Sequence, residues 1–214
     1  MKSGWLFLKR NIQWILLFFC MFFFLKIAED VFSQELMQID EIGYSLVSRY
    51  LISDFATPVA KFITQFGGSI FLVSFAIFLF LVLKNKKIGF CIWLNLVCVA
   101  VLNITMKAIF QRPRPEDLFL IEESGYSFPS GHSMVSAAFY GFLIYLIYHY
   151  VKNPYLKWAL IVFLVFFIGL IGISRIYLGV HYTSDVLGGF FLSISYLIVY
   201  IRFTSRFVLP KQAS

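Results

Sequence analysis

Charged residues are scarce in this sequence, and their scarcity argues against a water-soluble protein. Only 14% of the 214 residues are Asp, Glu, Lys or Arg, whereas a soluble domain carries about 25%. Hydrophobic residues make up 60%, the mean hydropathy is +0.84, and the 27 phenylalanines exceed what a water-exposed fold would bury. The composition therefore predicts that a lipid bilayer solvates much of the surface.

Cysteine is also scarce. The three cysteines, Cys20, Cys91 and Cys98, all lie within apolar runs, and their spacing matches no metal site. We interpret them as small hydrophobic residues. They say little about the redox compartment of the protein.

Long apolar runs are abundant. A membrane helix needs roughly 20 mostly apolar residues, and six segments of about this length are present: Trp5–Ala28, Pro58–Leu83, Ile88–Phe110, Ser133–Tyr150, Tyr155–Ile173 and Thr183–Ile201. The sequence thus predicts an all-α, polytopic membrane bundle of six transmembrane helices. We expect one domain over residues 1–203 and a polar tail over residues 204–214.

The segment Asp40–Asp54, after the first predicted span, is too polar to cross a membrane. Its apolar residues Ile42, Leu46 and Tyr50 follow helical spacing. This pattern predicts a short amphipathic helix lying in the membrane interface. An ordinary loop packed on the bundle fits the same pattern.

The charges are distributed unequally between the two sides that six spans define. The side with both termini holds eleven Lys and Arg and no acidic residue, whereas the other side holds seven cations and all eleven acids. These sums are +11 and −4, which give the net charge of +7. Because positive charge accumulates on the cytoplasmic side, we expect both termini to be cytoplasmic. The basic character then reflects topology and anionic lipid, and it does not indicate nucleic-acid binding.

Two clusters of polar residues lie where predicted spans meet the outward loops. In the first, Lys107 is followed after six residues by Arg114 and a proline; alone, a snorkelling lysine and a loop arginine would explain it. The second, Pro129–His132, opens the fourth span, where free backbone N–H groups attract anions. A simple helix start capped by Ser130 is the alternative for this cluster.

A third outward cluster contains Ser174 and Arg175, then His181 after five residues and Asp185 after three more. Residues four apart share one face of a helix, and a carboxylate bonded to one imidazole nitrogen leaves the other free to attack. A surface His–Asp pair would explain this cluster alone. Together, the three clusters place three cations, a helix N-terminus and two of the three histidines on one side. This combination indicates an anion-binding catalytic site.

The patterns K-x6-RP, PSGH and SR-x5-H-x3-D resemble the three signature motifs of the type 2 phosphatidic acid phosphatase superfamily, and every fixed position matches. The short loops and the chain length are similar to those of bacterial phosphatidylglycerophosphatase B enzymes and their undecaprenyl pyrophosphate phosphatase relatives. The resemblance implies a lipid phosphatase that acts through a phosphohistidine. Its expected reactions convert phosphatidylglycerophosphate to phosphatidylglycerol, undecaprenyl pyrophosphate to the monophosphate, or both.

The resemblance also implies residue roles. His181 would be the nucleophile, Asp185 would orient it, and His132 would be the general acid and base. Five residues would hold the phosphate oxygens: Lys107, Arg114, Ser130, Gly131 and Arg175. Because phosphoryl transfer needs mainly positioning and charge stabilisation, these cations and the helix start can replace a metal. We therefore expect no metal and no other cofactor.

Several alternatives stay open in the sequence. The loop acids Glu116, Asp117, Glu122 and Glu123 would form a solvated rim or bind a hard cation. Arg112 fits no motif position and would contact lipid headgroups or only water. A lipid phosphotransferase is compatible with the motifs, whereas a transporter is disfavoured because the spans hold almost no mid-membrane charge.

The expected location is the bacterial cell membrane, with the active site on its extracytoplasmic side. The expected partner there is a phosphorylated membrane lipid. The headgroup of that lipid and the oligomeric state are not indicated by the sequence.

Overall fold

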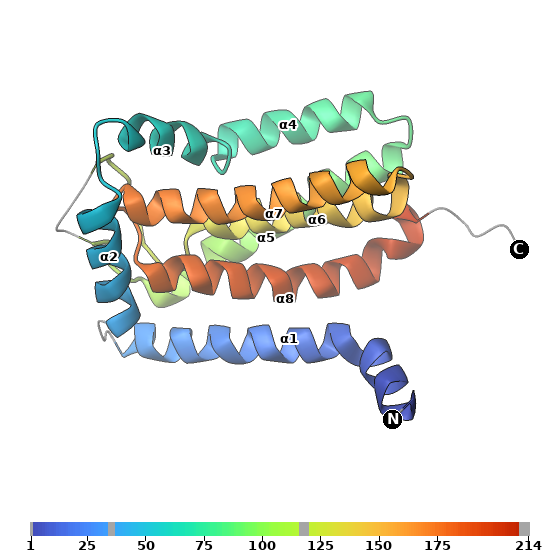
Figure 1. The fold of residues 1–214 in the computed structure, drawn as a ribbon, viewed down its shortest axis with the longest axis horizontal. Helices are drawn as coiled ribbons and strands as arrows, with labels where there is room; N and C mark the ends of the chain where they lie inside the picture. Colours follow the sequence, from blue (N-terminus) through green and yellow to red (C-terminus); the bar gives the residue numbers. More distant parts are fainter. Residues whose placement is uncertain (1, 34–36, 116–119, 210–214) are drawn as a thin grey trace, which may run out of the picture.

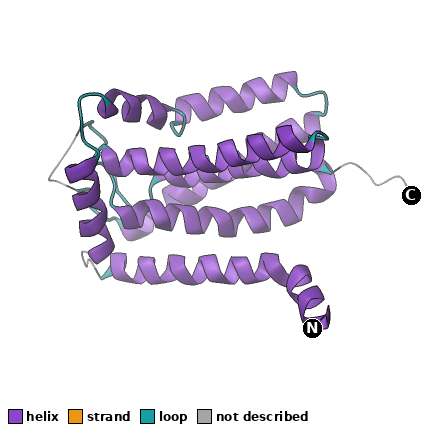
Figure 2. Cartoon of the chain, viewed as in Figure 1, coloured by secondary structure: helices purple, strands orange, loops and turns teal. Residues whose placement is uncertain are grey.

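The computed structural model describes residues 2–33, 37–115 and 120–209. Within these ranges the chain forms helices and no strand (Figure 2). The helices are α1 (Lys2–Phe32), α2 (Gln38–Tyr50), α3 (Ala56–Gln65), α4 (Ser69–Val82), α5 (Lys86–Phe110), α6 (Gly131–Tyr150), α7 (Pro154–Tyr177) and α8 (Thr183–Val208). The prediction of an all-α fold is confirmed.

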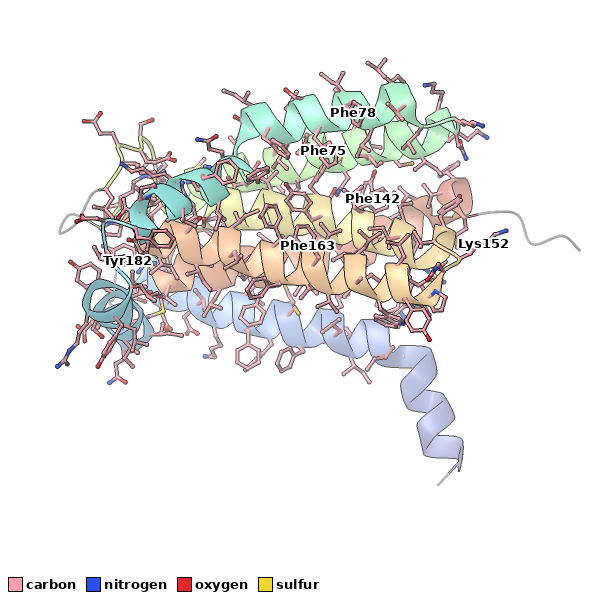
Figure 3. All side chains as sticks on the ribbon, turned by 45° about the horizontal axis from the view of Figure 1, so that its top comes forward. Phe75, Phe78, Phe142, Lys152, Phe163 and Tyr182 are labelled. Atoms are coloured by element: carbon pink, nitrogen blue, oxygen red, sulfur yellow. The ribbon has the colours of Figure 1, made fainter. Side chains whose placement is uncertain are left out.

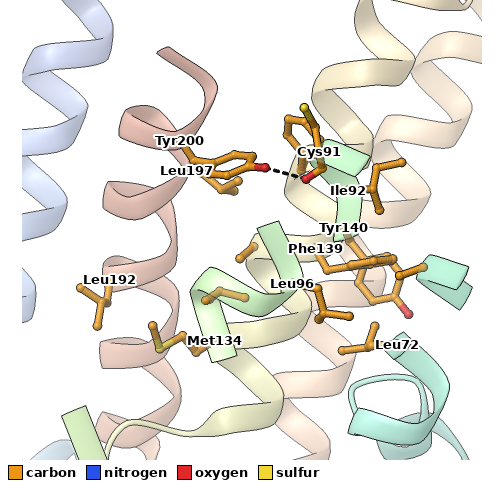
Figure 4. Close-up of a cluster of buried hydrophobic side chains, with 14 of the residues drawn as sticks. Leu72, Cys91, Ile92, Leu96, Met134, Phe139, Tyr140, Leu192, Leu197 and Tyr200 are labelled. Atoms are coloured by element: carbon orange, nitrogen blue, oxygen red, sulfur yellow. Dashed lines mark hydrogen bonds between the residues drawn. The ribbon is translucent and has the colours of Figure 1, made fainter. Parts of the chain in front are cut away.

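The long helices lie side by side, and α2 runs across one end of the bundle (Figure 1). Helix α6 is central, because it packs against α5, α7 and α8. Helix α1 packs on α8, and α4 packs on α5. The buried core includes Leu72, Ile92, Met134 and Phe139, each at most 1% exposed (Figure 4).

The outer surface of the bundle is apolar, as the composition predicts. Phe142 is completely buried, whereas Phe78 and Phe163 are 54% and 58% exposed and point away from the helices (Figure 3). Such a surface is stable in hydrocarbon, where exposed phenylalanine costs nothing, and unfavourable in water.

Short polar loops begin two of the long helices. The Asn85 side chain accepts a hydrogen bond from the Lys87 N–H at the start of α5. At the start of α7, Asn153 accepts from the N–H groups of Tyr155 and Leu156, and Pro154 occupies the first helical turn. These side chains satisfy backbone donors that have no partner within the helix.

By length and composition, four described helices, α5 to α8, are able to cross a membrane. Helices α3 and α4 make a fifth crossing if the bent pair is one span. The predicted span Pro58–Leu83 is therefore not one straight helix, because the pair is bent by 47° at a break between Gln65 and Ser69.

The break has a local cause. The N–H groups of Gly67 and Gly68 bond to the carbonyls three residues earlier at 3.0 Å, which tightens the turn, and Gly68 is then extended. A Cβ on Gly67 would lie 2.6 Å from Ile171 Cγ2. Only glycine therefore allows this turn to pack so closely on α7.

The segment predicted to be amphipathic does contain a helix, α2. Ile42, Leu46 and Tyr50 are 53–69% exposed and face away from the bundle, whereas Asp40 and Val47 are buried against it. At the other end of the chain, α8 continues to Val208, so its last turn includes the first residues of the predicted polar tail. Residues 210–214 lie outside the described ranges.

Gly188 offers a test of the packing between α8 and the loop before α6. A Cβ there would lie 2.5 Å from Phe128 Cε2, and the Phe128 ring is itself completely buried. Overpacking a core costs roughly 1–3 kcal/mol. We therefore expect Gly188→Ala to lower the Tm of the purified protein in detergent, measured by differential scanning fluorimetry.

The matched control is Gly169→Ala on α7, where a Cβ would meet no described atom within 4 Å. We expect its Tm to equal that of the wild type or to rise slightly. Equal Tm values for the two variants would contradict the tight contact at Gly188.

Candidate active site

The three sequence motifs meet at the end of the bundle that α2 crosses (Figure 1). Helices α5 and α7 end there, and α6 and α8 begin there. The loop between α5 and α6 and the loop between α7 and α8 supply the remaining residues. The site is therefore built from segments that the helix directions bring to one face.

His181 and Asp185 are in contact, with 3.3 Å between His181 Nδ1 and Asp185 Oδ2. His181 lies in the loop just before α8, so the two side chains touch without sharing a helix. Asp185 instead stands in the first turn and reaches back, since its Oδ2 also accepts the Tyr182 N–H at 2.8 Å. This is a capping arrangement, in which an acidic side chain satisfies a free donor at the helix start.

Ser127 belongs to the same group, although no sequence motif includes it. Its hydroxyl is completely buried, donates to Asp185 Oδ2 and lies 3.2 Å from His181 Nδ1. Its N–H donates to the Arg112 carbonyl at 2.8 Å. Ser127 lies only three residues before Ser130 in the chain, but serine is too common in loops for that position to be informative.

The environment of His181 keeps its imidazole neutral. Burial lowers the pKa of His181 to about 4, although Asp185 acts in the opposite direction. A neutral ring that donates from Nδ1 to Asp185 leaves a lone pair on Nε2. Nε2 lies 3.3 Å from Arg114 Nη1, so the free nitrogen faces a cation.

Arg114 connects the two loops. Its guanidinium donates to the carbonyls of Ser124 and Gly125 at 3.0 Å and to that of Val180 at 2.8 Å. This clamp is additional to the predicted contact with phosphate. It explains why an arginine with a fixed fork of donors suits the position better than a lysine.

Arg175 is almost completely buried, at 1% exposed. It donates to Thr64 Oγ1 at 2.8 Å and to Glu123 Oε1 at 2.5 Å. Its Nε–H has no hydrogen-bond partner among the described residues. A buried donor without a partner is costly, and an anion in the site would satisfy it.

Glu123 is not simply a solvated rim residue, as the sequence suggested. Its carboxylate bonds to Arg175 and lies 3.8 Å from Arg114 Nη2. Burial opposes its ionisation, but Arg175 outweighs burial and holds the pKa of Glu123 below the ordinary value of a glutamate. The contacts of Glu123 with two arginines could not be predicted from the spacing of residues in the sequence. Glu122 is exposed, and Glu116 and Asp117 lie outside the described residues.

Ser130 and Gly131 form the start of α6. Ser130 is completely buried, and its Oγ accepts from the Ser133 N–H and hydroxyl, as expected of a helix cap. Its own N–H donates to the Asp185 carbonyl at 3.1 Å. A Cβ on Gly131 would lie 3.1 Å from Asn103 Oδ1, so a larger residue would require the Asn103 side chain to shift slightly.

His132 and Lys107 complete the group. The electrostatic neighbours of His132 include Arg175, Glu123 and His181. Lys107 Nζ donates to the Tyr126 carbonyl, and its Cε lies 4.0 Å from the Cβ position of Gly131. The structure therefore brings all eight predicted site residues to one end of the bundle.

Arg112 is placed differently from both expectations for it. Its side chain is directed into the protein, because it is 7% exposed and bonds to Asp185 Oδ1 at 2.7 Å.

Within the described ranges, no three His, Cys, Asp or Glu side chains lie together in a way that would hold a metal ion. The arrangement can bind an anion next to an unprotonated imidazole nitrogen.

Comparison with known proteins identifies the family. The family model of the PAP2 superfamily matches residues 87–208. Phosphatidylglycerophosphatase B of Bacillus subtilis (strain 168) is 32% identical over 177 residues, which cover 80% of this chain and 86% of that protein. An undecaprenyl-diphosphatase of Sulfolobus acidocaldarius is 27% identical over 209 residues, which cover 92% and 94%.

Two solved structures have a similar fold. The crystal structure of a transmembrane PAP2-type phosphatidylglycerolphosphate phosphatase from Bacillus subtilis matches with a TM-score of 0.78 and 28% identity, covering 89% of this chain and 96% of that one. Aquifex aeolicus LpxE matches with a TM-score of 0.65 and 24% identity, covering 78% and 97%. From the matched family model, the relatives and the assembled motifs, the chain is an integral membrane protein that belongs to the PAP2 superfamily of lipid phosphatases.

Proposed function

We propose that this protein hydrolyses a phosphorylated membrane lipid through a phosphohistidine on His181. The observation that carries the proposal is the buried His181–Asp185 pair, whose free Nε2 faces Arg114. The expected substrates are phosphatidylglycerophosphate, undecaprenyl pyrophosphate, or both. The names of the two curated relatives support this substrate class.

In the first step, His181 Nε2 attacks phosphorus, and the bond from phosphorus to the leaving oxygen breaks. His132 donates a proton to that oxygen, so the lipid alcohol or lipid phosphate leaves with this oxygen protonated. Asp185 stabilises the imidazolium that forms. In the second step, His132 takes a proton from water, the water oxygen attacks phosphorus, the N–P bond breaks, and inorganic phosphate is released.

The phosphate oxygens would be held by Lys107, Arg114, Ser130, Gly131 and Arg175. The unpaired Nε–H of Arg175 supports this role. Positive side chains and a helix N-terminus stabilise the equatorial charge of the transition state. No metal or other cofactor is then needed. The incoming phosphate would compete with the Glu123 carboxylate for the two arginines.

We further propose that residues 1–203 form one six-span domain, with α1 and the α3–α4 pair as spans in addition to α5 to α8. Helix α2 would lie in the membrane interface, with its exposed apolar side chains in lipid. The positive charge on one side places both termini in the cytoplasm and the active site outside. A phosphorylated lipid would then be bound with its tails still in the bilayer.

A substrate panel tests the proposal. The purified protein is incubated with phosphatidylglycerophosphate, undecaprenyl pyrophosphate, phosphatidic acid and diacylglycerol pyrophosphate, and released inorganic phosphate is measured with and without EDTA. We expect release from at least one of the first two lipids, undiminished by EDTA. Loss of activity in EDTA would contradict the metal-independent scheme. Transfer of phosphate to a second lipid without release of inorganic phosphate would identify a phosphotransferase instead.

A further inference from the structure

A buried polar network lies behind the His181–Asp185 pair, and none of its members occupies a fixed position of the three motifs. Its members are Arg112, Asp40 and Ser184, which are 7%, 3% and 0% exposed. Arg112 belongs to the loop after α5, Asp40 to α2, and Ser184 to the first turn of α8. None of these side chains is needed to hold phosphate, so their joint burial requires another explanation.

Arg112 binds two carboxylates, that of Asp40 within the network and that of the catalytic-site Asp185. Its Nη1 donates to Asp185 Oδ1 and to Ser184 Oγ, each at 2.7 Å, and its Nη2 donates to Asp40 Oδ2 at 2.8 Å. The guanidinium also lies over the Tyr182 ring, 4.0 Å from its centroid. A guanidinium fixed on so many sides is a rigid donor.

Asp40 joins α2 to the start of α8. Its Oδ1 accepts the Ser184 N–H at 2.8 Å, and its Oδ2 accepts the Ser184 hydroxyl at 2.8 Å. An acidic residue of one helix thus caps the N-terminus of another, where free donors and the helix dipole favour negative charge. A Cβ on Gly43 would lie 1.9 Å from Thr183 Oγ1, so glycine lets α2 approach α8 closely enough.

The network determines how the two oxygens of Asp185 are used. Arg112 holds Oδ1, which leaves Oδ2 for Ser127, the Tyr182 N–H and His181. The Arg112 carbonyl also accepts the Ser127 N–H, which sets the position of that hydroxyl. Without the arginine, Asp40 and Asp185 would be two neighbouring buried carboxylates, and one of them would protonate or turn away.

We infer that Arg112, held by Asp40 of α2, is a positioning residue that keeps Asp185 ionised and directed at His181. This inference rests on the proposed function of His181. It gives α2 a role in catalysis although no residue of α2 belongs to a motif. Arg112 acts through Asp185 and does not touch the reacting phosphate.

The test is a double-mutant cycle on kcat and KM for the best lipid of the panel. Arg112→Gln is expected to lower kcat about 10- to 100-fold, the range of one charge-assisted hydrogen bond. KM should change less than about threefold, because the phosphate contacts stay. Arg112→Lys should restore part of kcat, since a lysine keeps the charge but not the fork.

The same substitution is then made in an Asp185→Ala background, with residual turnover measured on radiolabelled lipid. There Arg112→Gln should cost less than about threefold in kcat, because no carboxylate is left to position. Asp40→Asn is the milder second variant and keeps the test valid if Arg112→Gln does not fold. We expect it to lower kcat roughly 3- to 10-fold in the wild type and to have no further effect without Asp185.

Arg49→Gln is the matched control, because it removes the same charge from the exposed side of α2. It should leave kcat and KM unchanged. Three results would overturn this inference and leave the proposed function intact. They are equal kcat values for Arg112→Gln and Arg49→Gln, an effect of Arg112→Gln on KM alone, and the same loss of kcat from Arg112→Gln with and without Asp185. Absence of phosphate release by the wild type would instead overturn the proposed function on which it rests.

Discussion

Replacing His181 with alanine is expected to abolish turnover, with kcat at least about 10³-fold lower than in the wild type. His181 is buried, its imidazole is neutral, and its free nitrogen faces Arg114. The residues that bind phosphate stay in place, so substrate binding should persist. The measurement is phosphate release together with trapping of a labelled, acid-labile phosphoenzyme, which should be absent from the variant.

The chain provides a matched control in its third histidine. His149 is exposed at the far end of α6, where its Nδ1 contacts the Tyr145 carbonyl. His149→Ala should retain full activity and the labelled intermediate. A phosphoenzyme that survives in His181→Ala would contradict the assignment of the nucleophile, whatever happens to the rate.

Replacing Arg175 with alanine is expected to lower kcat/KM about 10²- to 10³-fold, the usual effect of removing one charged donor at a transition state. Arg175 is the most buried cation of the site, and its Nε–H has no partner among the described residues. Inhibition by vanadate, which mimics the pentavalent transition state, should weaken in parallel. The kcat/KM and the inhibition by vanadate are measured on the purified protein.

Arg175→Lys should restore only a small part of the activity. A lysine provides one point charge, whereas the guanidinium reaches Thr64 and Glu123 with two nitrogens and keeps a third N–H free. Arg202→Ala, at the exposed far end of α8, is the control for loss of one positive charge and should be silent. Equal vanadate inhibition of Arg175→Ala and wild type would show that Arg175 supports the fold and does not bind the phosphate.

Glu123 contributes a negative charge to the same site. Its carboxylate binds Arg175 and lies near Arg114, so the site contains an anion supplied by the chain itself. In the proposed mechanism, binding of a phosphate would therefore exchange one anion for another. An anion beside the two arginines lowers the electrostatic cost of keeping them close together in an apolar protein.

The motif residues could be predicted because each motif is local. The intervals within K-x6-RP, PSGH and SR-x5-H-x3-D are set within single loops and helix starts, and charge sorting places them on one side. The break at Gly67 and Gly68 was not predicted, because the two helices together still pass as one apolar span. The close approach of Gly67 to Ile171, more than a hundred residues later, is a contact that only the tertiary structure shows.

The sequence by itself determined that this is a membrane protein, that it is helical, and that it carries the PAP2 motifs. These conclusions follow from composition, from apolar run length and from short spacings, all of which are local quantities. Only the tertiary structure decided that Arg112 meets Asp40 across 72 residues and that Asp40 meets Ser184 across 144. Such contacts depend on how close two helices approach, and that distance is set by the side chains packed between them, which no periodicity in one segment records.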